Sequence, residues 1–455
     1  MVYLCMFLYR LSDEWANGGD YLMKTYSIKI IADYIQATKN EIAIDKSVYD
    51  LAGVTPESLG YIPRPAKVVS KFIKQRIFFK IAMNMLRGVW RIGGAPLFFF
   101  YEMVTFYKYS RRLPDHTKMN HSGQSGEYAL GFSSRAGDIL TSQVLGFEPK
   151  YWIMFPWTNF NNNERKSAVI DVFCLLNGKD LFRAFVLSVI ATHRIACRED
   201  IKQWILQSYT AFRWFAVRLA LDKLSIDKLI IAEHYDRWAV LADSVVSQRR
   251  KSIKGSRSSG PKLVLVQHGS LSGLSSIECV SKFVLPFELS YKLKSVTDVF
   301  VYDTTSQRVF DREVLSASCV RKGVSFRQFS PAIKLIEFPS ENSVRVLFVG
   351  HPICERLHTH LLLNLVQSYD VTFYYKPHPT AGVADSVRRQ TWQIIEGAQT
   401  FPEVGFLIAY PSTLVVEYAA LGVSAILHPL DLNPEFSSGL LESIKSKLDA
   451  LDCKK

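Results

Sequence analysis

Residues 371–380 read Val-Thr-Phe-Tyr-Tyr-Lys-Pro-His-Pro-Thr, which predicts a buried β-strand that stops abruptly. Valine, threonine, phenylalanine and tyrosine favour a strand over residues 371–375. Pro377 and Pro379 end it, because proline has no N–H for the sheet and fixes φ. They also hold the backbone on both sides of His378. Loops at the carboxyl ends of strands bind ligands in open α/β sheets. A ligand loop is therefore predicted here, with a plain proline turn and a surface histidine as the alternative.

Strands and helices alternate on both sides of this segment. Toward the C-terminus, strands are predicted over 344–349, 404–409 and 423–427, and helices over 353–368, 383–396, 414–421 and 440–451. Toward the N-terminus, strands are predicted over 228–232, 263–266 and 298–302, with a helix over 237–247. Strand–helix–strand spacing of this kind indicates right-handed crossovers and parallel sheets. We predict an α/β fold with two doubly wound, Rossmann-type domains, residues 1–290 and 291–455.

The less regular parts of the chain are predicted from composition. Residues 114–165 are rich in Asn, Ser, Gly and His, which predicts loops with short elements. Residues 248–262 form a polar, basic stretch without packing residues, which predicts a flexible loop. Residues 1–9 are apolar but lack a basic leader and a small-residue cleavage site, so a first strand is predicted rather than a signal peptide.

Size and cysteine usage limit the class of protein. A chain of 455 residues with 48% hydrophobic content can form two cores. Its seven cysteines are scattered, which predicts reduced thiols rather than a disulfide framework or a zinc site. No run of about 18 uncharged apolar residues occurs, so no membrane span is predicted. These features are typical of a cytoplasmic protein.

The net charge of +13 is concentrated in one segment. Residues 64–112 contain eleven Lys and Arg but a single acid, Glu102, together with several Phe and Trp residues. Basic residues mixed with large apolar ones suit an anionic membrane surface, which we predict as the partner of this helical segment. A nucleic-acid surface is the competing interpretation and is not favoured. The remaining alternative is an apolar side that packs on the protein and a solvated basic side.

Five short loops follow predicted strands. Glu233–Asp236 and Gln267–Gly269 lie in the N-terminal half, and Gly350–Pro352, Lys376–Pro379 and Pro411–Thr413 lie in the C-terminal half. If the two domains face each other, all five loops line one cleft. That arrangement is called GT-B, and we predict it here, with the basic helical segment as an N-terminal insertion.

The C-terminal loops carry candidate donor-binding residues. Ser412 or Thr413 can cap the next helix, and the free N–H groups beyond can hold a phosphate. The alternative is an ordinary helix cap. Glu417 lies one turn into that helix on the same face and could accept hydrogen bonds from a ribose, or simply be solvated. We expect His378 to converge with the Ser412–Thr413 pair on one phosphate from adjacent strands.

Histidines supply the remaining candidate groups of the C-terminal half. His378 can donate to the phosphate of a departing nucleotide and stabilise its charge. Lys376 can add a positive charge there, or be solvated at the end of its strand. Gly350 permits close approach of the backbone to a ligand, and His351 beside it is a further candidate contact.

The N-terminal half carries the candidate base. His268 precedes Gly269, and an imidazole can take a proton from an acceptor hydroxyl. Glu233 and Asp236 are rival bases, because carboxylates at a strand end also face the cleft. A core histidine bonded to backbone is the alternative for His268. No metal site and no cofactor beyond a nucleotide donor are predicted.

Two stretches resemble a known group of enzymes. Tyr374–Pro379 and Pro411–Val423 resemble bacterial GT-B transferases that use cytidine-activated donors. These include sialyl- and polysialyltransferases, capsule Kdo transferases and CDP-glycerol glycerophosphotransferases. The His-Pro motif and the Ser/Thr pair of these enzymes bind the cytidine nucleotide. The resemblance implies this role for His378, Pro379 and the pair Ser412 and Thr413.

A third stretch, Gln267–Gly269, resembles the His-Gly motif of the glycerophosphotransferases, whose histidine is a candidate base. Ser270-Leu271-Ser272 follow it here in place of Thr-Pro and Lys, which disfavours a glycerol-phosphate donor. The resemblance implies a glycosyltransferase that moves a Kdo or sialic-acid sugar from a CMP-sugar donor. The acceptor would be a surface polysaccharide or lipid-linked glycan at the inner membrane. The alternatives are a CDP-polyol phosphotransferase, an enzyme of the UDP-sugar 2-epimerase class and an inactive scaffold.

Overall fold

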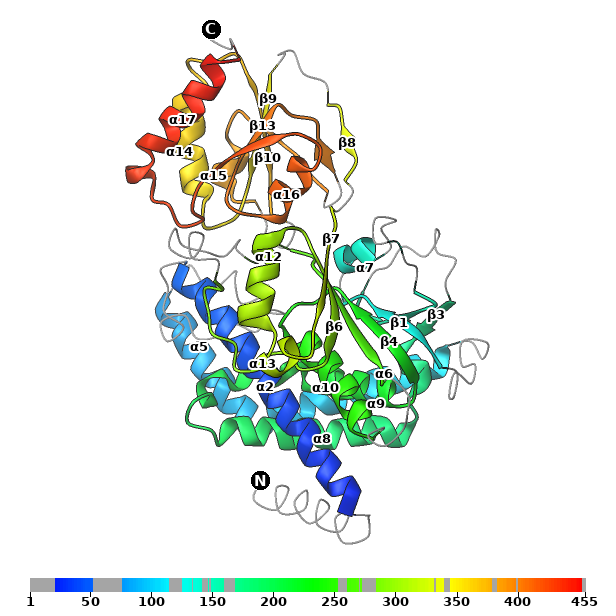
Figure 1. Ribbon diagram of the computed structural model, residues 1–455. Helices are drawn as coiled ribbons and strands as arrows, with labels where there is room; N and C mark the ends of the chain where they lie inside the picture. The colour runs from blue at the N-terminus through cyan, green and yellow to red at the C-terminus, as the bar shows by residue number, and fades with distance from the viewer. Residues whose placement is uncertain are drawn as a thin grey trace.

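The computed structural model contains two α/β units, one above the other in Figure 1. It describes residues 21–51, 76–113, 125–132, 134–140, 146, 149–158, 168–252, 260–269, 271, 284–330, 333–338, 344–378, 383–397 and 400–451. The expected strand over residues 1–9 and the tip of the expected loop, residues 253–259, lie outside these ranges. So do residues 64–75 of the basic segment and Pro379.

A seven-stranded parallel sheet forms the centre of the first unit, in the order β3-β2-β1-β4-β5-β6-β7. The strands are β1 (Ser125–Leu130), β2 (Tyr151–Met154), β3 (Ala168–Asp171), β4 (Ser225–Ile231), β5 (Lys262–Val266), β6 (Val296–Val301) and β7 (Ser325–Gln328). The order runs outward from β1 and β4 in both directions, as in a Rossmann-type doubly wound sheet. The prediction of a parallel α/β fold is confirmed.

Helices cover the first sheet, with most of them below it in Figure 1. They are α2 (Tyr21–Leu51), α5 (Arg76–Val89), η1 (Trp90–Gly94), α6 (Ala95–Arg112), α7 (Ser134–Leu140), η4 (Val172–Leu175), α8 (Gly178–Ala196), η5 (Lys202–Thr210), α9 (Ala211–Asp222), α10 (Arg237–Ser252), α12 (Thr304–Val309), η6 (Phe310–Val314) and α13 (Ala317–Val320). Helix α9 is buried on nearly every side. Reciprocal hydrogen bonds between Asn177 and Asp180 start α8 as a capping box.

The second unit contains a five-stranded parallel sheet in the order β11-β10-β9-β13-β14. Its strands are β9 (Arg345–Val349), β10 (Thr372–Lys376), β11 (Gln393–Ile394), β13 (Phe406–Ala409) and β14 (Ser424–Leu427), and β8 (Leu335–Ile336) pairs separately with β12 (Phe401–Pro402). Its helices are α14 (Glu355–Leu365), α15 (Asp385–Arg388), α16 (Thr413–Ala419), η7 (Pro434–Phe436) and α17 (Ser438–Asp449). Gly422 follows α16 with φ of +82°, a backbone conformation that glycine adopts without strain.

Three expectations are corrected and one is confirmed. The helix over 383–396 is wrong, because α15 stops at Arg388 and residues 393–394 pair with β10 instead. Residues 114–165 contain short elements as expected, among them β1 and β2 of the first sheet. The boundary at residue 290 falls inside the first unit, since β6 and β7 pair within its sheet. The two ends of the loop predicted over 248–262 belong to regular elements, because α10 continues to Ser252 and β5 begins at Lys262.

The described part of the basic segment, residues 76–112, forms one continuous helix. A π-helical turn, η1, joins α5 to α6 at Gly93-Gly94, so the helix continues from Arg76 to Arg112. In the described part of the chain, no helix is both long enough and apolar enough to cross a bilayer. Cys174, Cys197, Cys319 and Cys354 are free thiols.

Candidate active site

Strand order places a histidine between the two predicted donor loops. Strand β9 lies between β10 and β13, so the loops that carry His378 and Ser412 do not follow adjacent strands as expected. His351, which follows β9, occupies the intervening position. Its ring centroid lies 5.2 Å from that of His378 and 5.6 Å from that of Tyr410. His351 is therefore the central residue of this group.

Both histidines of this group are neutral at pH 7. Burial, followed by the nearby His378, lowers the pKa of His351 to about 4. Burial also lowers the pKa of His378. The Ile353 backbone N–H donates to Nδ1 of His351 at 3.2 Å, so the ring proton of His351 lies on Nε2. These rings can bind an anion as N–H donors rather than as cations.

Gly350 makes room for a tyrosine, which corrects its expected role in ligand approach. A Cβ atom at Gly350 would lie 2.3 Å from the Tyr375 hydroxyl and from Cζ of its ring. The Tyr375 side chain is almost completely buried. Glycine at this position is thus required by packing within the second unit.

Replacing Gly350 with alanine should destabilise the protein by about 1–3 kcal/mol, because the methyl group forces Tyr375 out of its place. The free energy of urea unfolding measures this loss. Gly439→Ala in α17 is the matched control, because nothing lies within 4 Å of a Cβ there and alanine favours the helix. Equal stability of the two variants would contradict the packing role.

Lys376 is also structural rather than a donor-binding residue. Its ammonium group donates to the backbone oxygens of Gly397 at 2.8 Å and Thr400 at 2.7 Å. The side chain is 5% exposed and passes over the ring of Phe401. We therefore leave Lys376 out of the site.

Helix α16 begins at Thr413, and Ser412 is its N-cap residue by backbone position. The Ser412 hydroxyl makes no capping bond, and Oγ is shielded from solvent without a hydrogen-bond partner among the described residues. Buried hydroxyls normally have such a partner, so this oxygen is suited to a ligand. Glu417 is fully buried, so its expected alternative as a solvated residue is wrong.

The edge of the first sheet carries the second polar group. Glu233 and His234 follow β4, and His268 follows β5, the neighbouring strand. The His268 backbone N–H donates to Nε2 of His234 at 2.9 Å, and the two rings lie 4.4 Å apart. Nε2 of His268 lies 4.0 Å from Oε2 of Glu233. The structure thus brings two of the predicted candidates, His268 and Glu233, into one cluster.

His234 was missed by sequence reasoning as a functional residue. Burial, followed by the neighbouring His268, lowers the pKa of His234 well below its usual value. The ring is therefore neutral, and its unprotonated Nε2 fixes the backbone of the His268 loop. The sequence offered one indication of this role, because His234 lies within Glu233–Asp236, directly after a predicted strand.

Asp236 caps a helix, which argues against its expected role as base. Its Oδ1 accepts the backbone N–H groups of Trp238 and Ala239, each at 2.9 Å, at the start of α10. Burial, followed by the charge of Glu41, raises the pKa of Asp236. We therefore consider His268 and Glu233 as the remaining bases.

Helix α2 anchors this cluster from the far N-terminal side of the sequence. Asn40 donates to the backbone oxygen of Tyr235 at 2.9 Å and to that of Tyr291 at 3.0 Å. Glu41 accepts the backbone N–H of Arg237 at 3.1 Å and pairs with its guanidinium. The loop that carries Glu233 and His234 is thus fixed by a helix almost 200 residues earlier in the chain.

The two sheet edges meet where the loop Gln267–Gly269 of the first unit faces the loop Pro411–Thr413 of the second. A Cβ atom on Gly269 would lie 3.6 Å from the Thr413 hydroxyl. Beside this contact is a cavity of about 160 Å³, smaller than typical small-molecule pockets. Residues of both units line it, among them Gln267, Tyr302, Ser306, Pro411, Ser412 and Val416. Gln267 fixes its own loop by bonds to Ser306 and to the N–H of Tyr302.

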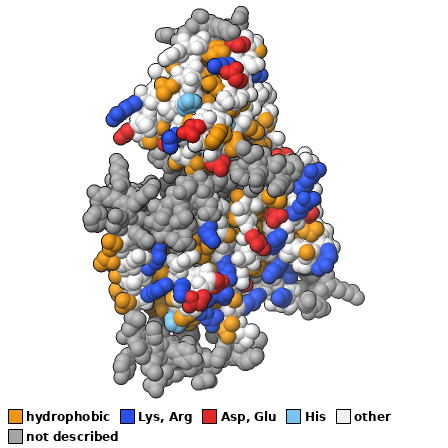
Figure 2. Space-filling model, turned by 90° about the vertical axis from the view of Figure 1, so that its left-hand side faces the viewer, with side chains coloured by type: hydrophobic (Ala, Val, Ile, Leu, Met, Phe, Trp, Pro, Cys, Tyr) orange, Lys and Arg blue, Asp and Glu red, His pale blue; other side chains and the backbone are white. Residues whose placement is uncertain are grey.

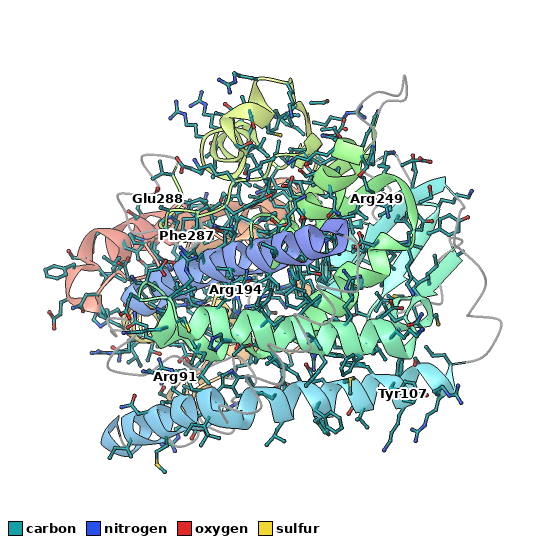
Figure 3. The ribbon with its side chains drawn as sticks, turned by 90° about the horizontal axis from the view of Figure 1, so that it is seen from below. Arg91, Tyr107, Arg194, Arg249, Phe287 and Glu288 are labelled. Atoms are coloured by element: carbon teal, nitrogen blue, oxygen red, sulfur yellow. The ribbon has the colours of Figure 1, made fainter. Side chains whose placement is uncertain are left out.

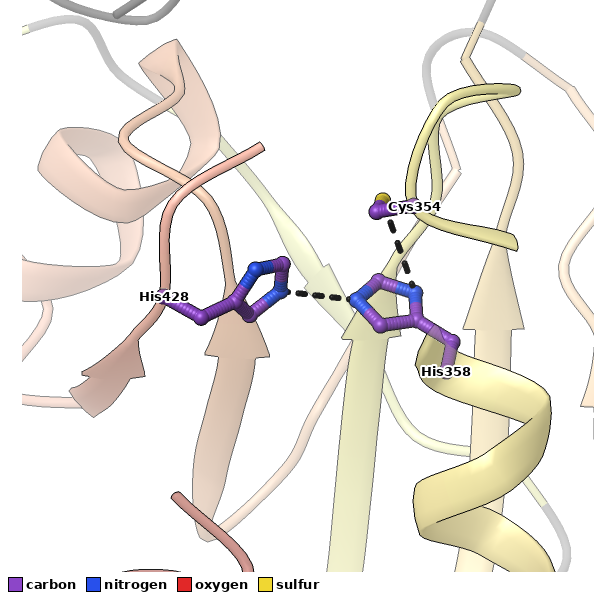
Figure 4. A group of neighbouring side chains, drawn as sticks. All are labelled: Cys354, His358 and His428. Carbon is purple, nitrogen blue, oxygen red and sulfur yellow. Dashed lines mark hydrogen bonds between the residues drawn. The ribbon is translucent and has the colours of Figure 1, made fainter. Parts of the chain in front are cut away.

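A buried group of possible metal ligands lies behind His351. In the described part of the chain, Cys354, His358 and His428 form the one group of this composition (Figure 4). Nε2 of His358 and Nε2 of His428 lie 2.8 Å apart, and Nδ1 of His428 lies 2.8 Å from the Pro429 oxygen. The Cys354 thiol lies near the other nitrogen of His358, at 3.9 Å. These contacts join the three side chains, and one possible ligand atom from each lies within 4.8 Å of the other two.

The structure brings some of the predicted site residues together and gives others a structural role. Of the predicted site residues, the structure groups Glu233 with His268 and His351 with His378, and it places Ser412 and Thr413 where the two units meet. It assigns packing, capping or anchoring roles to Gly350, Asp236 and Lys376. No protein-family model matches the chain, and no curated protein matches its sequence.

Proposed function

We propose that the chain is a GT-B glycosyltransferase that transfers a sugar of the Kdo or sialic-acid type from a CMP-sugar. The acceptor in this proposal is a surface polysaccharide or a lipid-linked glycan. One observation carries it: the carboxyl edges of two parallel sheets meet beside Gly269 and Thr413, and each edge carries its own cluster of polar side chains. Open α/β sheets bind ligands at such edges.

On the acceptor side, His268 is the proposed general base. A base must lie within hydrogen-bond reach of the proton it removes, and it benefits from a group that orients it. Glu233 is that group, because its carboxylate lies 4.0 Å from Nε2 of His268 and stabilises the imidazolium that forms. His234 holds the backbone of the same loop.

On the donor side, neutral N–H and O–H groups are proposed to hold the phosphate of the nucleotide. His351 follows β9, the strand between those that precede His378 and Ser412, and its Nε2–H and the Ser412 hydroxyl are the proposed donors to the phosphate. Such preorganised donors stabilise the negative charge that develops on the departing CMP. This proposal assigns no step to a metal ion.

Nucleotide binding is tested by thermal unfolding. We expect CMP to raise the Tm, because a ligand at about 100 times its Kd stabilises the native state by about 2.7 kcal/mol. Ser412→Ala and His351→Ala should each weaken CMP binding about 10- to 100-fold, the usual worth of a hydrogen bond to a charged group. His360→Ala is the control, because His360 is exposed on α14.

The reaction itself is tested by mass spectrometry with candidate donors. Transfer from a CMP-sugar to a glycan acceptor is the expected result. Transfer of a phosphorylated polyol from a CDP-polyol, or conversion of a UDP-sugar without acceptor, would replace the proposal with one of the alternatives. Absence of any Tm shift with CMP, CDP and UDP would refute a nucleotide-dependent enzyme.

A further inference from the structure

The long helix α5–η1–α6 is apolar on two opposite sides. Its inner side, which includes Ala95, Phe99 and Phe106, is buried against the protein. Its outer side carries Met85, Val89, Ile92, Leu97, Phe100 and Tyr101, all of them exposed. Leu97 is 71% exposed and Met85 is 67% exposed. We call these six residues the outer apolar face. A helix that is apolar on both sides is usually covered on both sides.

The π-helical turn keeps this face continuous. On the outer apolar face, Met85, Val89 and Ile92 are three or four residues apart, which is about one helical turn. Leu97 and Tyr101 are likewise four residues apart. The step from Ile92 to Leu97 is one residue longer than a helical turn, and it crosses η1. A π-helical turn contains one extra residue, so the two halves of the face stay aligned from Met85 to Tyr101, along about 24 Å of helix.

Apart from one buried residue, the charged residues on the helix that carries the outer apolar face have one sign. Glu102 is the one acidic residue between Arg76 and Arg112. It is buried on the inner side, where Arg213 donates to its carboxylate at 2.7 Å. The exposed charged side chains on this helix are basic, and they include Arg91, Arg111 and Arg112.

The position of the helix leaves its outer side uncovered by the described elements. Figure 3 shows α5–η1–α6 at the outer edge of the helical layer, with α8 between it and α2. Arg91 and Tyr107 are labelled at different places along it. Figure 2 shows hydrophobic side chains gathered at the edge of the larger unit, with Lys and Arg side chains next to them.

We propose that the outer apolar face docks the protein on the surface of an anionic lipid bilayer, with the helix lying in the plane of the membrane. Apolar side chains then enter the boundary of the acyl chains, while Arg and Lys reach the lipid phosphates. A second copy of the chain would bring like charges together. Nucleic acid would bind the basic side chains but would not cover the exposed apolar side chains of Met85, Val89 and Ile92. The inference is independent of sugar transfer, because it rests on surface chemistry alone.

Sedimentation of the full chain with vesicles tests this surface. We expect binding to vesicles of phosphatidylcholine mixed with phosphatidylglycerol, weaker binding to phosphatidylcholine alone, and release by salt. Leu97→Glu/Tyr101→Glu should lower the partition coefficient at least about tenfold. Arg111→Gln/Arg112→Gln should lower it about tenfold or more, at about fivefold per charge near the surface.

Matched controls replace equivalent exposed residues elsewhere. Leu363→Glu/Phe436→Glu changes two exposed apolar residues of the second unit, and Arg321→Gln/Lys322→Gln removes two exposed charges near α13. Both should bind like the unchanged protein, and circular dichroism should show that every variant is folded. Equal loss in controls and test variants, or no binding to anionic vesicles at low salt, would overturn the proposal. So would a dimer that Leu97→Glu/Tyr101→Glu dissociates without lipid, or tighter binding to RNA than to vesicles.

Discussion

Replacing His268 with alanine is expected to lower the transfer rate about 10²- to 10⁴-fold, the usual contribution of a general base. The loss should fall on kcat, because the imidazole acts on the acceptor proton in the transition state. Added imidazole should restore part of the rate in this variant, since the truncated side chain leaves space next to Glu233. Steady-state kinetics with the donor found by mass spectrometry measures both effects.

Further variants distinguish the role of His268 from that of Glu233. Glu233→Gln should lose less rate than His268→Ala, because Glu233 is proposed to orient the imidazole and stabilise its charge. His193→Ala is the control, because His193 is an exposed histidine at the end of α8 and belongs to neither histidine cluster. This variant should keep the full rate. If Glu233→Gln loses as much as His268→Ala and imidazole rescues neither, then Glu233 is the base and the assignment of His268 is wrong.

Removing the charge of Glu41 should destabilise the protein by about 3–5 kcal/mol, because Arg237 is then left buried without its partner. The two side chains are each 9% exposed, and Nη2 of Arg237 lies 3.1 Å from Oε2 of Glu41. Arg237 also donates to Gln207 at 2.9 Å, so it cannot turn to solvent without breaking further bonds. The midpoint of urea unfolding of Glu41→Gln measures this effect.

Two comparisons make the stability prediction specific. Glu442→Gln breaks an exposed ion pair with Lys445 and should cost less than about 1 kcal/mol. The double variant Glu41→Met/Arg237→Met should be more stable than Glu41→Gln alone, because no unpaired charge remains buried. Equal loss in Glu41→Gln and Glu442→Gln would show that the buried pair has no special role.

Much of the second unit followed from local signals in the sequence. Strand β10 was placed within a residue, because its β-branched and aromatic residues and the proline after it act locally. The strand predicted over 423–427 likewise agrees with β14, residues 424–427. The first unit was less predictable. Strand β1 reads Ser-Gly-Glu-Tyr-Ala-Leu, and only its pairing with β2 and β4 makes it a central strand.

The site shows the same division. The sequence alone determined which residue types stand at the ends of strands, because hydrophobic pattern, prolines and glycines are local features of the chain. Only the tertiary structure decided which of these ends are neighbours: β9 lies between β10 and β13, so His351 separates His378 from Ser412. Tertiary packing also brings the Tyr375 ring against Gly350. It places α2 against the loop that carries Glu233. Such contacts join residues far apart in sequence, and their energies depend on burial and partners that no local pattern records.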